Sequence, residues 1–479
     1  MIHFDWNSYG QKVMSGEILV SEWTMLSVKK HYDDLKASPN NGFYFSEKHA
    51  QYALNSFLFM KHSKGEFSGK QFIPSPWQQF WIALAFGWRK TDGTRRYREV
   101  YWAVPRKNGK TTTLASIALY AMLMDGEPGA EVYCAATKMD KAKLLYSEAD
   151  QMIKASALLK QRTKSMRDGI FTTDRTCKLV PLGRDSKSMD GLNPSCCVID
   201  EVHAHKTSEI YDVLKSALGA RRQPIIWIIT TAGFDLSAWG YEQHRYAEKV
   251  VKGVIKDETF LPIIYTVDDP NKWDDPIEWA KANPNLGISV YVDNLKEDCE
   301  RAKKQPSQQP NFKTKRLNIW LASGETWIPI EDWRKHGDKT LSLDDFKGEK
   351  CWIGIDLAEK SDVAALCLCF KRGNHFYLFF RLYLNEYEVM KPENQHYRRW
   401  RDEGELIVTD GNATDFDEIR ADLLQYNEDF RLVGVPYDPR FSSYFATKLI
   451  EDGLPMIEVA QTSTHFTEPN IQIENKVLE

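Results

Sequence analysis

The sequence predicts an α/β protein with two separate sheets. In its first half, short apolar runs of strand length alternate with helical stretches, at 100–104, 131–136, 196–199 and 225–229. Strands separated by helices are typical of a mostly parallel sheet buried on both faces. From residue 350 the strands at 351–358, 363–370 and 375–383 follow one another through short turns. That pattern predicts an antiparallel meander.

The bulk properties are those of a globular protein. The chain has 479 residues, of which 42% are hydrophobic and 27% charged, and its net charge is −4. This length suggests about two to four domains. Because the charge is slightly negative, any nucleic-acid binding has to come from local basic surfaces. No signal peptide, membrane span or zinc-type cysteine spacing is apparent, so we expect a cytoplasmic protein with reduced thiols and no membrane partner.

A candidate phosphate-binding loop follows the strand at 100–104. Asn108, Gly109, Lys110 and Thr111 lead from that strand into a helical stretch. Loop N–H groups and a helix N-terminus bind phosphate, Lys110 is placed to reach the β and γ groups, and the Thr111 hydroxyl is suited to Mg²⁺. Val104 stands where the usual pattern has its first glycine. An ordinary strand, turn and helix with a surface lysine is therefore the alternative.

Two carboxylates, Asp200 and Glu201, come directly after the strand at 196–199. Ligands bind at the carboxyl ends of strands in parallel α/β sheets. Asp200 is suited to hold Mg²⁺, and Glu201 to orient and deprotonate an attacking water. Two acids after a strand are often only a turn. Together with the Lys110 loop, however, they favour a nucleotide-hydrolysing site.

Other polar residues of the first half extend this hypothesis. Gln78 begins an aromatic helix upstream of Lys110, and its carboxamide can both donate to and accept from an adenine edge; a helix N-terminus with outward polar groups is the alternative. Thr230 and Thr231 end a buried strand, where they are placed to sense the γ-phosphate or simply to form a polar turn. His203 and His205 lack a third nearby ligand, so we favour a surface or supporting role over metal binding.

A basic run follows a stretch rich in turn residues. Six positive charges occur with no acid between them, at Arg301, Lys303, Lys304, Lys313, Lys315 and Arg316. The run fits a solvated helix face and contact with a phosphate backbone equally well.

In the second half, Asp356 interrupts the apolar strand 351–358, and Asp438 ends another strand. An acid within a core strand is costly unless a cation lies on it, and a metal ion is the usual answer. Two acids converging from neighbouring strands form half of a two-metal phosphodiesterase site. Structural acids at strand ends are the alternative.

Taken in order, these motifs resemble those of the large terminase subunit of tailed bacteriophages, from about Pro76 to the C-terminus. The resemblance lies in residues 104–111, 190–195, 198–203, 230–233, 283–287, 354–357 and 436–439. It also accounts for Val104, because terminase phosphate loops commonly depart from the glycine pattern.

The resemblance implies an N-terminal P-loop ATPase domain of the ASCE type, with a mostly parallel sheet, and a C-terminal nuclease domain with an RNase H-like α/β fold. We place a helical region of the ATPase at 1–70, the ATPase domain at 71–260, a linker subdomain at 261–345 and the nuclease domain at 346–479.

The resemblance also implies roles for individual residues. ATP and Mg²⁺ are expected at Gln78, Arg106, Asn108, Gly109, Lys110, Thr111, Thr112, Asp200, Glu201, Thr230 and Thr231. An arginine from a neighbouring subunit is also expected, with Arg162, Arg167 and Arg184 as candidates.

In the nuclease, Asp356 and Asp438 match the first two acids that bind Mg²⁺ or Mn²⁺ in a two-metal site. A third acid is expected nearer a C-terminal helix, but the sequence stops at Glu479. Asp362 and Asp415 are in reach, and the motif places neither as a replacement. We therefore expect weakened metal affinity and weak cutting.

The expected function is DNA packaging, in which ATP hydrolysis drives double-stranded DNA into the procapsid and the nuclease cleaves concatemeric DNA. The expected partners are double-stranded DNA, the portal protein, the small terminase subunit and further copies of the chain in a ring, with a monomer in solution. We expect it in the host bacterial cytoplasm. A helicase-like ATPase without nuclease activity and a non-catalytic assembly module are the alternatives.

Overall fold

The computed structural model describes residues 2–183, 191–322, 328, 330–338, 340–358, 362–391 and 394–478. The chain forms two compact units, Met1–Trp327 and Ile328–Glu479. The division falls inside the segment expected as a linker, so residues 261–327 belong with the first unit. No helix among the described residues is long and apolar enough to cross a membrane.

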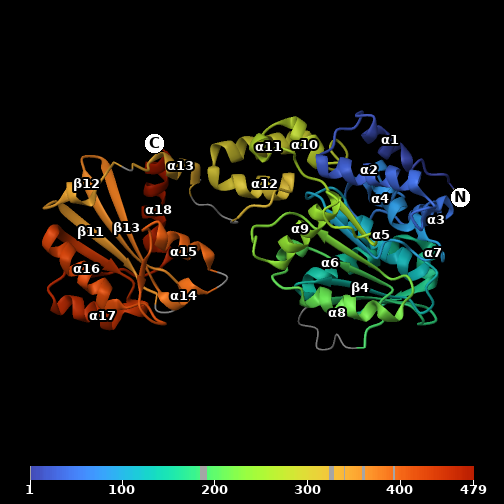
Figure 1. Ribbon diagram of the computed structural model, residues 1–479. Coiled ribbons are helices and arrows are strands. Elements are labelled where there is room, and N and C mark those ends of the chain that lie inside the picture. Colours follow the sequence, from blue (N-terminus) through green and yellow to red (C-terminus); the bar gives the residue numbers. More distant parts are fainter. Residues whose placement is uncertain are drawn as a thin grey trace. The chain divides into compact units, whose positions relative to one another are not determined.

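An eight-stranded sheet forms the centre of the first unit, in the order β10-β3-β9-β8-β4-β7-β6-β5 (Figure 1). The strands from β10 to β7 in that order are parallel, and β6 and β5 continue the sheet in antiparallel pairing. Their bounds are β3 Glu99–Ala103, β4 Glu131–Ala136, β5 Thr163–Ser165, β6 Ile170–Thr172, β7 Lys178–Gly183, β8 Cys196–Ile199, β9 Ile225–Thr230 and β10 Phe260–Ile264.

Both faces of this sheet are buried, which explains why its strands are apolar throughout. Val100 and Trp102 of β3 belong to the core on the side of α4 and α5, whereas Tyr101 and Ala103 belong to the core on the side of α8 and α9. The helices are α1 Asn7–Met14, α2 Glu22–Ala37, α3 Glu47–Ser56, α4 Pro76–Gly87, α5 Lys110–Leu123, α6 Met139–Ala155, α7 Ala157–Arg162, α8 Glu209–Ala217 and α9 Trp239–Val251. A separate two-stranded antiparallel sheet pairs β1 Phe43–Phe45 with β2 Trp88–Lys90.

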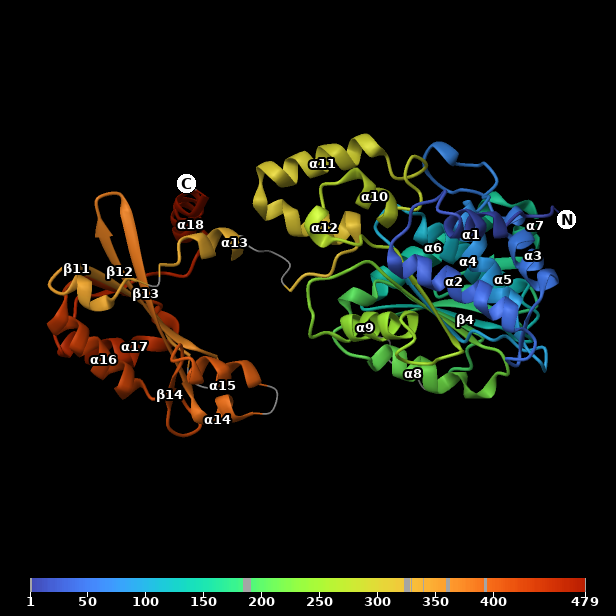
Figure 2. The ribbon, with the colours of Figure 1, turned by 45° about the horizontal axis from the view of Figure 1, so that its top comes forward.

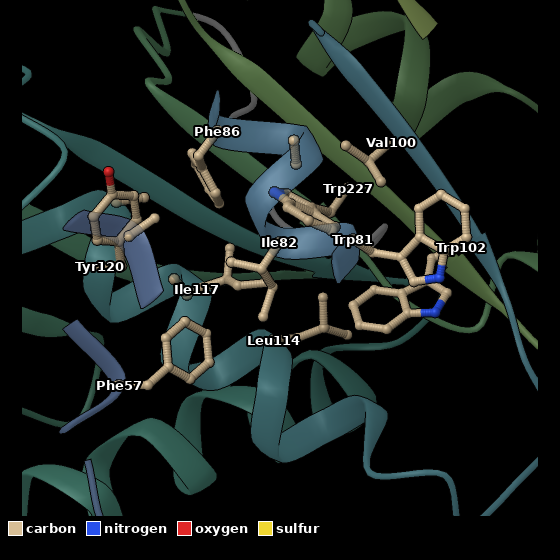
Figure 3. Packing of buried hydrophobic residues seen from close by; sticks show 14 of the residues in the cluster. Phe57, Trp81, Ile82, Phe86, Val100, Trp102, Leu114, Ile117, Tyr120 and Trp227 are labelled. Atoms are coloured by element: carbon tan, nitrogen blue, oxygen red, sulfur yellow. The ribbon is translucent and has the colours of Figure 1, made fainter. Parts of the chain in front are cut away.

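Close packing of α4 against α5 fixes the helix that follows the phosphate loop. Figure 3 shows Ile82 of α4 beside Leu114 and Ile117 of α5, and all three side chains are fully buried. Because this contact is dry and close-packed, the N-terminus of α5 is held on a rigid support.

The last part of the first unit is a small helical segment with its own core. It contains α10 Pro276–Ala282, α11 Val292–Lys304 and α12 Gln309–Leu317. Trp279, Phe312 and Leu317 are buried together in that core. We refer to residues 266–321 as the linker segment.

The second unit has a six-stranded sheet in the order β14-β13-β12-β11-β15-β16 (Figure 2). β11, β12 and β13 form an antiparallel meander, whereas β15 is parallel to β11, β16 to β15, and β14 to β13. The elements are β11 Lys350–Asp356, β12 Ala364–Arg372, β13 His375–Asn385, β14 Ile407–Thr409, β15 Arg431–Tyr437, β16 Met456–Glu458, α13 Ile330–Lys335, α14 Glu386–Met390, α15 Gln395–Asp402, α16 Phe416–Asp429, α17 Pro439–Glu451 and α18 Ser463–Leu478.

The predicted α/β class, with a mostly parallel first sheet and an antiparallel meander in the second, is confirmed. One expectation about the second sheet is wrong. Asp356 does not interrupt a core strand, because β11 ends at Asp356 and the side chain is exposed. Its position therefore carries no burial cost, and a bound cation is not needed to explain it.

The buried ion pair of the first unit gives a test of its stability. Arg95 is fully buried, and its guanidinium donates to both carboxylate oxygens of Asp125 at 2.7 Å. Asp125→Ala would leave that charge unpaired, so we expect the free energy of unfolding to fall by about 3–5 kcal/mol. Urea unfolding followed by tryptophan fluorescence measures this loss.

The matched control is Asp33→Ala, which removes an exposed carboxylate 3.9 Å from Lys36. Such surface pairs contribute about 0–1 kcal/mol. Equal losses in the two variants would contradict the assignment of Arg95 and Asp125 as a buried structural pair.

Candidate functional site

The phosphate loop makes a tight turn into the N-terminus of α5. Gly109 precedes the helix with φ 79°, and Lys107 also has positive φ, at 73°. A Cβ added to Gly109 would lie 3.1 Å from Nε2 of Gln78, so both conformation and space favour glycine here. The first N–H groups of a helix have no partner within it, which makes this turn suitable for an anion.

Lys110 lies half-buried behind this loop. Its Nζ donates to the carbonyl of Val104 at 2.6 Å and is 3.4 Å from that of Thr230. Burial lowers the pKa of Lys110 to about 8, although Glu201 and Asp200 favour the charged form. Among the described residues, no carboxylate lies within salt-bridge distance of Nζ. An ammonium held only by neutral carbonyls fits a site that receives an anionic group.

Asp200 and Glu201 follow β8 at the same sheet edge. Asp200 Oδ1 accepts a hydrogen bond from the Glu201 N–H at 2.8 Å. Burial, with the neighbouring Glu201, raises the pKa of Asp200 to about 6, against the effect of Lys110. Glu201 adopts the left-handed conformation, with φ 52°. This conformation is uncommon outside glycine, and such strain clusters at functional sites.

His203 connects Glu201 to the end of β9. Its Nδ1 is 3.1 Å from Oε2 of Glu201, 3.3 Å from Oγ1 of Thr230 and 3.4 Å from Oγ1 of Thr231. Its backbone N–H donates to Thr230 Oγ1 at 2.9 Å. Burial and the nearby cations lower the pKa of His203 to about 3, so the imidazole is neutral at pH 7. Thr230 and Thr231 are buried, with their hydroxyls against this histidine.

Residues of the linker segment form hydrogen bonds with the phosphate loop. Asn108 is fully buried; its Nδ2 donates to Asn283 Oδ1 at 3.0 Å, and its Oδ1 accepts from the Asn285 N–H at 3.0 Å. Asn285 Oδ1 in turn accepts from the Trp77 indole N–H at 2.7 Å. Ser289 Oγ donates to the Lys107 carbonyl at 2.6 Å. The side chain of Asn108 is thus committed to the protein, and only its backbone is available to a ligand.

The remaining predicted nucleotide residues surround this loop. Gln78 is buried, and its amide accepts from the Ser75 N–H and donates to Thr113, which ties α4 to α5. Thr111 is exposed on the first turn of α5, and Arg106 is exposed on the loop. The Thr112 hydroxyl is 3.5 Å from Oε1 of Glu148 on α6.

The basic run does not form one surface. Lys303 pairs with Asp274 at 3.0 Å and Arg316 with Asp298 at 2.7 Å. Lys313 lies over the ring of Trp273, and Lys315 Nζ lies 3.5 Å from Nε2 of His203. Four of the six basic side chains therefore have contacts within the protein, whereas Arg301 and Lys304 are exposed.

The neighbouring-subunit arginine candidates do not share one position. Arg162 ends α7, and Arg167 lies between β5 and β6; both are exposed. Arg184, like Asp190 of the 190–195 motif, lies outside the described residues.

In the second unit, Asp356 and Asp438 occupy equivalent positions on adjacent parallel strands. Ile355 of β11 pairs with Tyr437 of β15, and each acid is the next residue along the chain. This register brings both carboxylates to the same edge of the sheet, as the sequence predicted. Asp356 is exposed and Asp438 is half-buried.

Another acid, Glu458, ends β16 and was not singled out from the sequence. It pairs with Tyr437 of β15, so it is in register with the residue before Asp438 and not with Asp438 itself. Asp415, one of the two candidates in reach, accepts from the Asp417 N–H as the N-cap of α16, and Asp362 is exposed just before β12. Among the described residues, no three acids, histidines or cysteines lie close enough together to hold one metal ion.

Comparison with known proteins agrees with this arrangement. The family model described as terminase large subunit, ATPase domain, matches residues 76–249, and the model described as terminase large subunit, endonuclease domain, matches residues 254–479. The resemblance found in the sequence is confirmed. ATPase and endonuclease domains imply the use of a nucleotide and a divalent metal in general.

Individual relatives were also found. Protein YmfN of Escherichia coli (strain K12) is 33% identical over 297 residues, which cover 60% of this chain and 65% of YmfN. The matched part is thus just under two thirds of that protein. The terminase large subunit of Enterobacteria phage HK97 is 22% identical, over 75% of this chain and 72% of that one. The crystal structure of the HK97 large terminase aligns with a TM-score of 0.50 at 19% identity, covering 90% of this chain and 88% of that one, which shows a shared fold.

The clamp on the phosphate loop gives a second prediction. Asn285→Ala removes the acceptor of the Trp77 indole N–H and contacts to the loop, so we expect a loss of stability of about 1–3 kcal/mol. We also expect weaker binding of a fluorescent nucleotide, because the loop loses its support. The control is Asn294→Ala at an exposed position of α11. Nucleotide affinity equal to that of the wild type in both variants would contradict the clamp.

Proposed function

Because the chain belongs to the terminase large-subunit family and carries its ATPase and endonuclease domains, we propose that it is a phage DNA-packaging motor subunit. ATP hydrolysis in the first unit drives double-stranded DNA into the procapsid, and the second unit cleaves concatemeric DNA. The observation that carries this proposal is that the parallel strands β3, β9 and β8 bring the Lys110 loop and the Asp200–Glu201 pair to one edge of the sheet.

In the proposed site, the loop backbone and Lys110 hold the β- and γ-phosphates, with Arg106 at the loop surface. Thr111 and Asp200 hold Mg²⁺, which supplies charge neutralisation on the phosphate oxygens when it is bound. Glu201 accepts the proton of the attacking water. Neutral His203 keeps the Glu201 carboxylate fixed beside Thr230 and Thr231, so that the end of β9 is coupled to hydrolysis.

Gln78 remains our candidate for the adenine edge, although in this structure its amide is buried and hydrogen-bonded to Ser75 and Thr113. In the second unit, Asp356 and Asp438 hold Mg²⁺ or Mn²⁺ for phosphodiester cleavage. The partners we propose are double-stranded DNA, the portal protein, the small terminase subunit and further copies in a ring on the portal. Packaging takes place in the host bacterial cytoplasm.

Glu201→Gln tests the ATPase assignment. The amide cannot accept the water proton, so we expect ATP turnover to fall about 10²–10⁴-fold while nucleotide binding is retained. Turnover is measured by phosphate release, and binding by calorimetry. Glu209→Gln, at an exposed position of α8, is the control. Turnover that survives Glu201→Gln would exclude this residue as the base.

Asp356→Asn and Asp438→Asn test the nuclease assignment. Each removes one metal-binding carboxylate, so we expect Mn²⁺- or Mg²⁺-dependent nicking of supercoiled plasmid to be lost while ATP turnover in the same samples is unchanged. Asp344→Asn, at an exposed position before β11, should cut like the wild type.

Two results would favour the alternatives. Strand unwinding with no cutting by the wild type would favour a helicase-like motor. A chain that neither binds nor hydrolyses ATP would favour a non-catalytic assembly module.

A further inference from the structure

Lys315 of the linker segment lies in the last turn of α12, and it is fastened to the nucleotide site at its backbone. Its carbonyl accepts a hydrogen bond from the Arg106 N–H at 3.0 Å. Three residues later, Asn318 accepts from the Ala232 N–H at 2.5 Å and donates to the Tyr265 carbonyl at 2.7 Å. The end of α12 is therefore fixed against both the phosphate loop and the segment after β9.

The side chain of Lys315 points into the same site. Its Nζ is 3.5 Å from His203 Nε2 and 3.5 Å from the Ala232 carbonyl. His203 in turn contacts Glu201, so only the imidazole separates Lys315 from that carboxylate. Burial and the nearby Arg106 lower the pKa of Lys315. Among the described residues, Lys315 has no carboxylate within salt-bridge distance, whereas its neighbour Arg316 is paired with Asp298.

Three cationic residues are held close together at this site. The Arg106 N–H donates to the Lys315 carbonyl at 3.0 Å, and the Nζ of Lys110 lies 3.4 Å from the carbonyl of Thr230, whose hydroxyl accepts from the His203 N–H at 2.9 Å. Like charges held together in a half-buried site cost free energy unless an anion enters between them. The carboxylates nearby, Asp200 and Glu201, are those expected to serve metal and water, so a phosphate is the anion that fits.

We propose that Lys315 is a phosphate-contacting residue of the nucleotide site, supplied by the linker segment of the same chain and directed at the γ-phosphate. The neighbours of Lys315 indicate which phosphate it contacts. Glu201 has to lie beside the γ-phosphate to activate water, and His203 connects Lys315 to Glu201. Lys110 lies instead at the ends of β3 and β9. This inference rests on the proposed ATPase function and adds the residue by which the site distinguishes a triphosphate from a diphosphate.

His203 acts as a positioning residue in this arrangement. Its neutral ring separates the Lys315 ammonium from the Glu201 carboxylate, so the two do not neutralise each other in a direct ion pair.

The test compares Lys315→Gln with Lys313→Gln, two residues away on the same helix and stacked over Trp273. Calorimetry on the full chain measures the binding of ADP and of a non-hydrolysable ATP analogue, with Mg²⁺. We expect Lys315→Gln to weaken analogue binding by about 10-fold, the value of one charge-assisted hydrogen bond, and to leave ADP binding unchanged. Lys313→Gln should alter neither, and Lys315→Arg should restore most of the analogue affinity.

Three outcomes would overturn the proposal. Unchanged analogue affinity would show that Lys315 does not contact the γ-phosphate. Equal losses for both nucleotides, accompanied by a lower unfolding temperature, would show a structural role. If the wild-type chain binds neither nucleotide, both the ATPase proposal and the Lys315 proposal fail. If the wild-type chain binds both nucleotides and Lys315→Gln behaves like the wild type, only the Lys315 proposal fails.

Discussion

The parallel register of the strands from β10 to β7 is the constraint on which the candidate nucleotide site depends. Parallel strands end at the same sheet edge, so residues that follow β3, β8 and β9 are brought together although they are far apart in the sequence. Lys110, Asp200 and Thr230 meet in this way. Burial of both faces of the sheet fixes these strand ends, and the α4–α5 contact fixes the helix that carries the loop.

A second constraint comes from the linker segment. The endonuclease-domain family model includes it, since that match begins at residue 254, but its contacts place it with the first unit. Asn283 and Asn285 hold the phosphate loop, and the end of α12 holds Arg106 and Ala232. The linker segment is thus part of the wall of the candidate nucleotide site.

Much of the fold was predictable from the sequence because each buried strand is a short apolar run bounded by turn residues. The strands at 131–136 and 196–199 were predicted with the bounds observed. The convergence of Asp200 with Lys110 also followed, since strand order fixes where residues that end strands lie. The burial of Asp356 was predicted wrongly, because an apolar run does not reveal that β11 ends at this residue.

The parts of the site that the sequence did not reveal are contacts between distant segments. Asn108 and Asn283 are separated by 175 positions, and Lys315 and His203 by 112. Nothing in the run 301–316 distinguishes Lys315 from its basic neighbours, because the difference lies in the direction of its side chain. The 283–287 motif did signal the clamp, but only as a marker of resemblance without a physical role.

The candidate sites of the two units also differ in how far their charged side chains are exposed to solvent and hydrogen-bonded to the protein. Around Lys110 the charged groups are partly desolvated and fixed by neighbouring carbonyls, imidazole and backbone N–H groups, so their electrostatic effect on a ligand is strong and needs little rearrangement. Asp356 is exposed to water at a strand end, where a carboxylate is well hydrated and mutual repulsion with Asp438 is screened. The charged groups of the candidate site in the first unit are therefore held in place by the protein, whereas the Asp356 carboxylate of the second unit faces solvent.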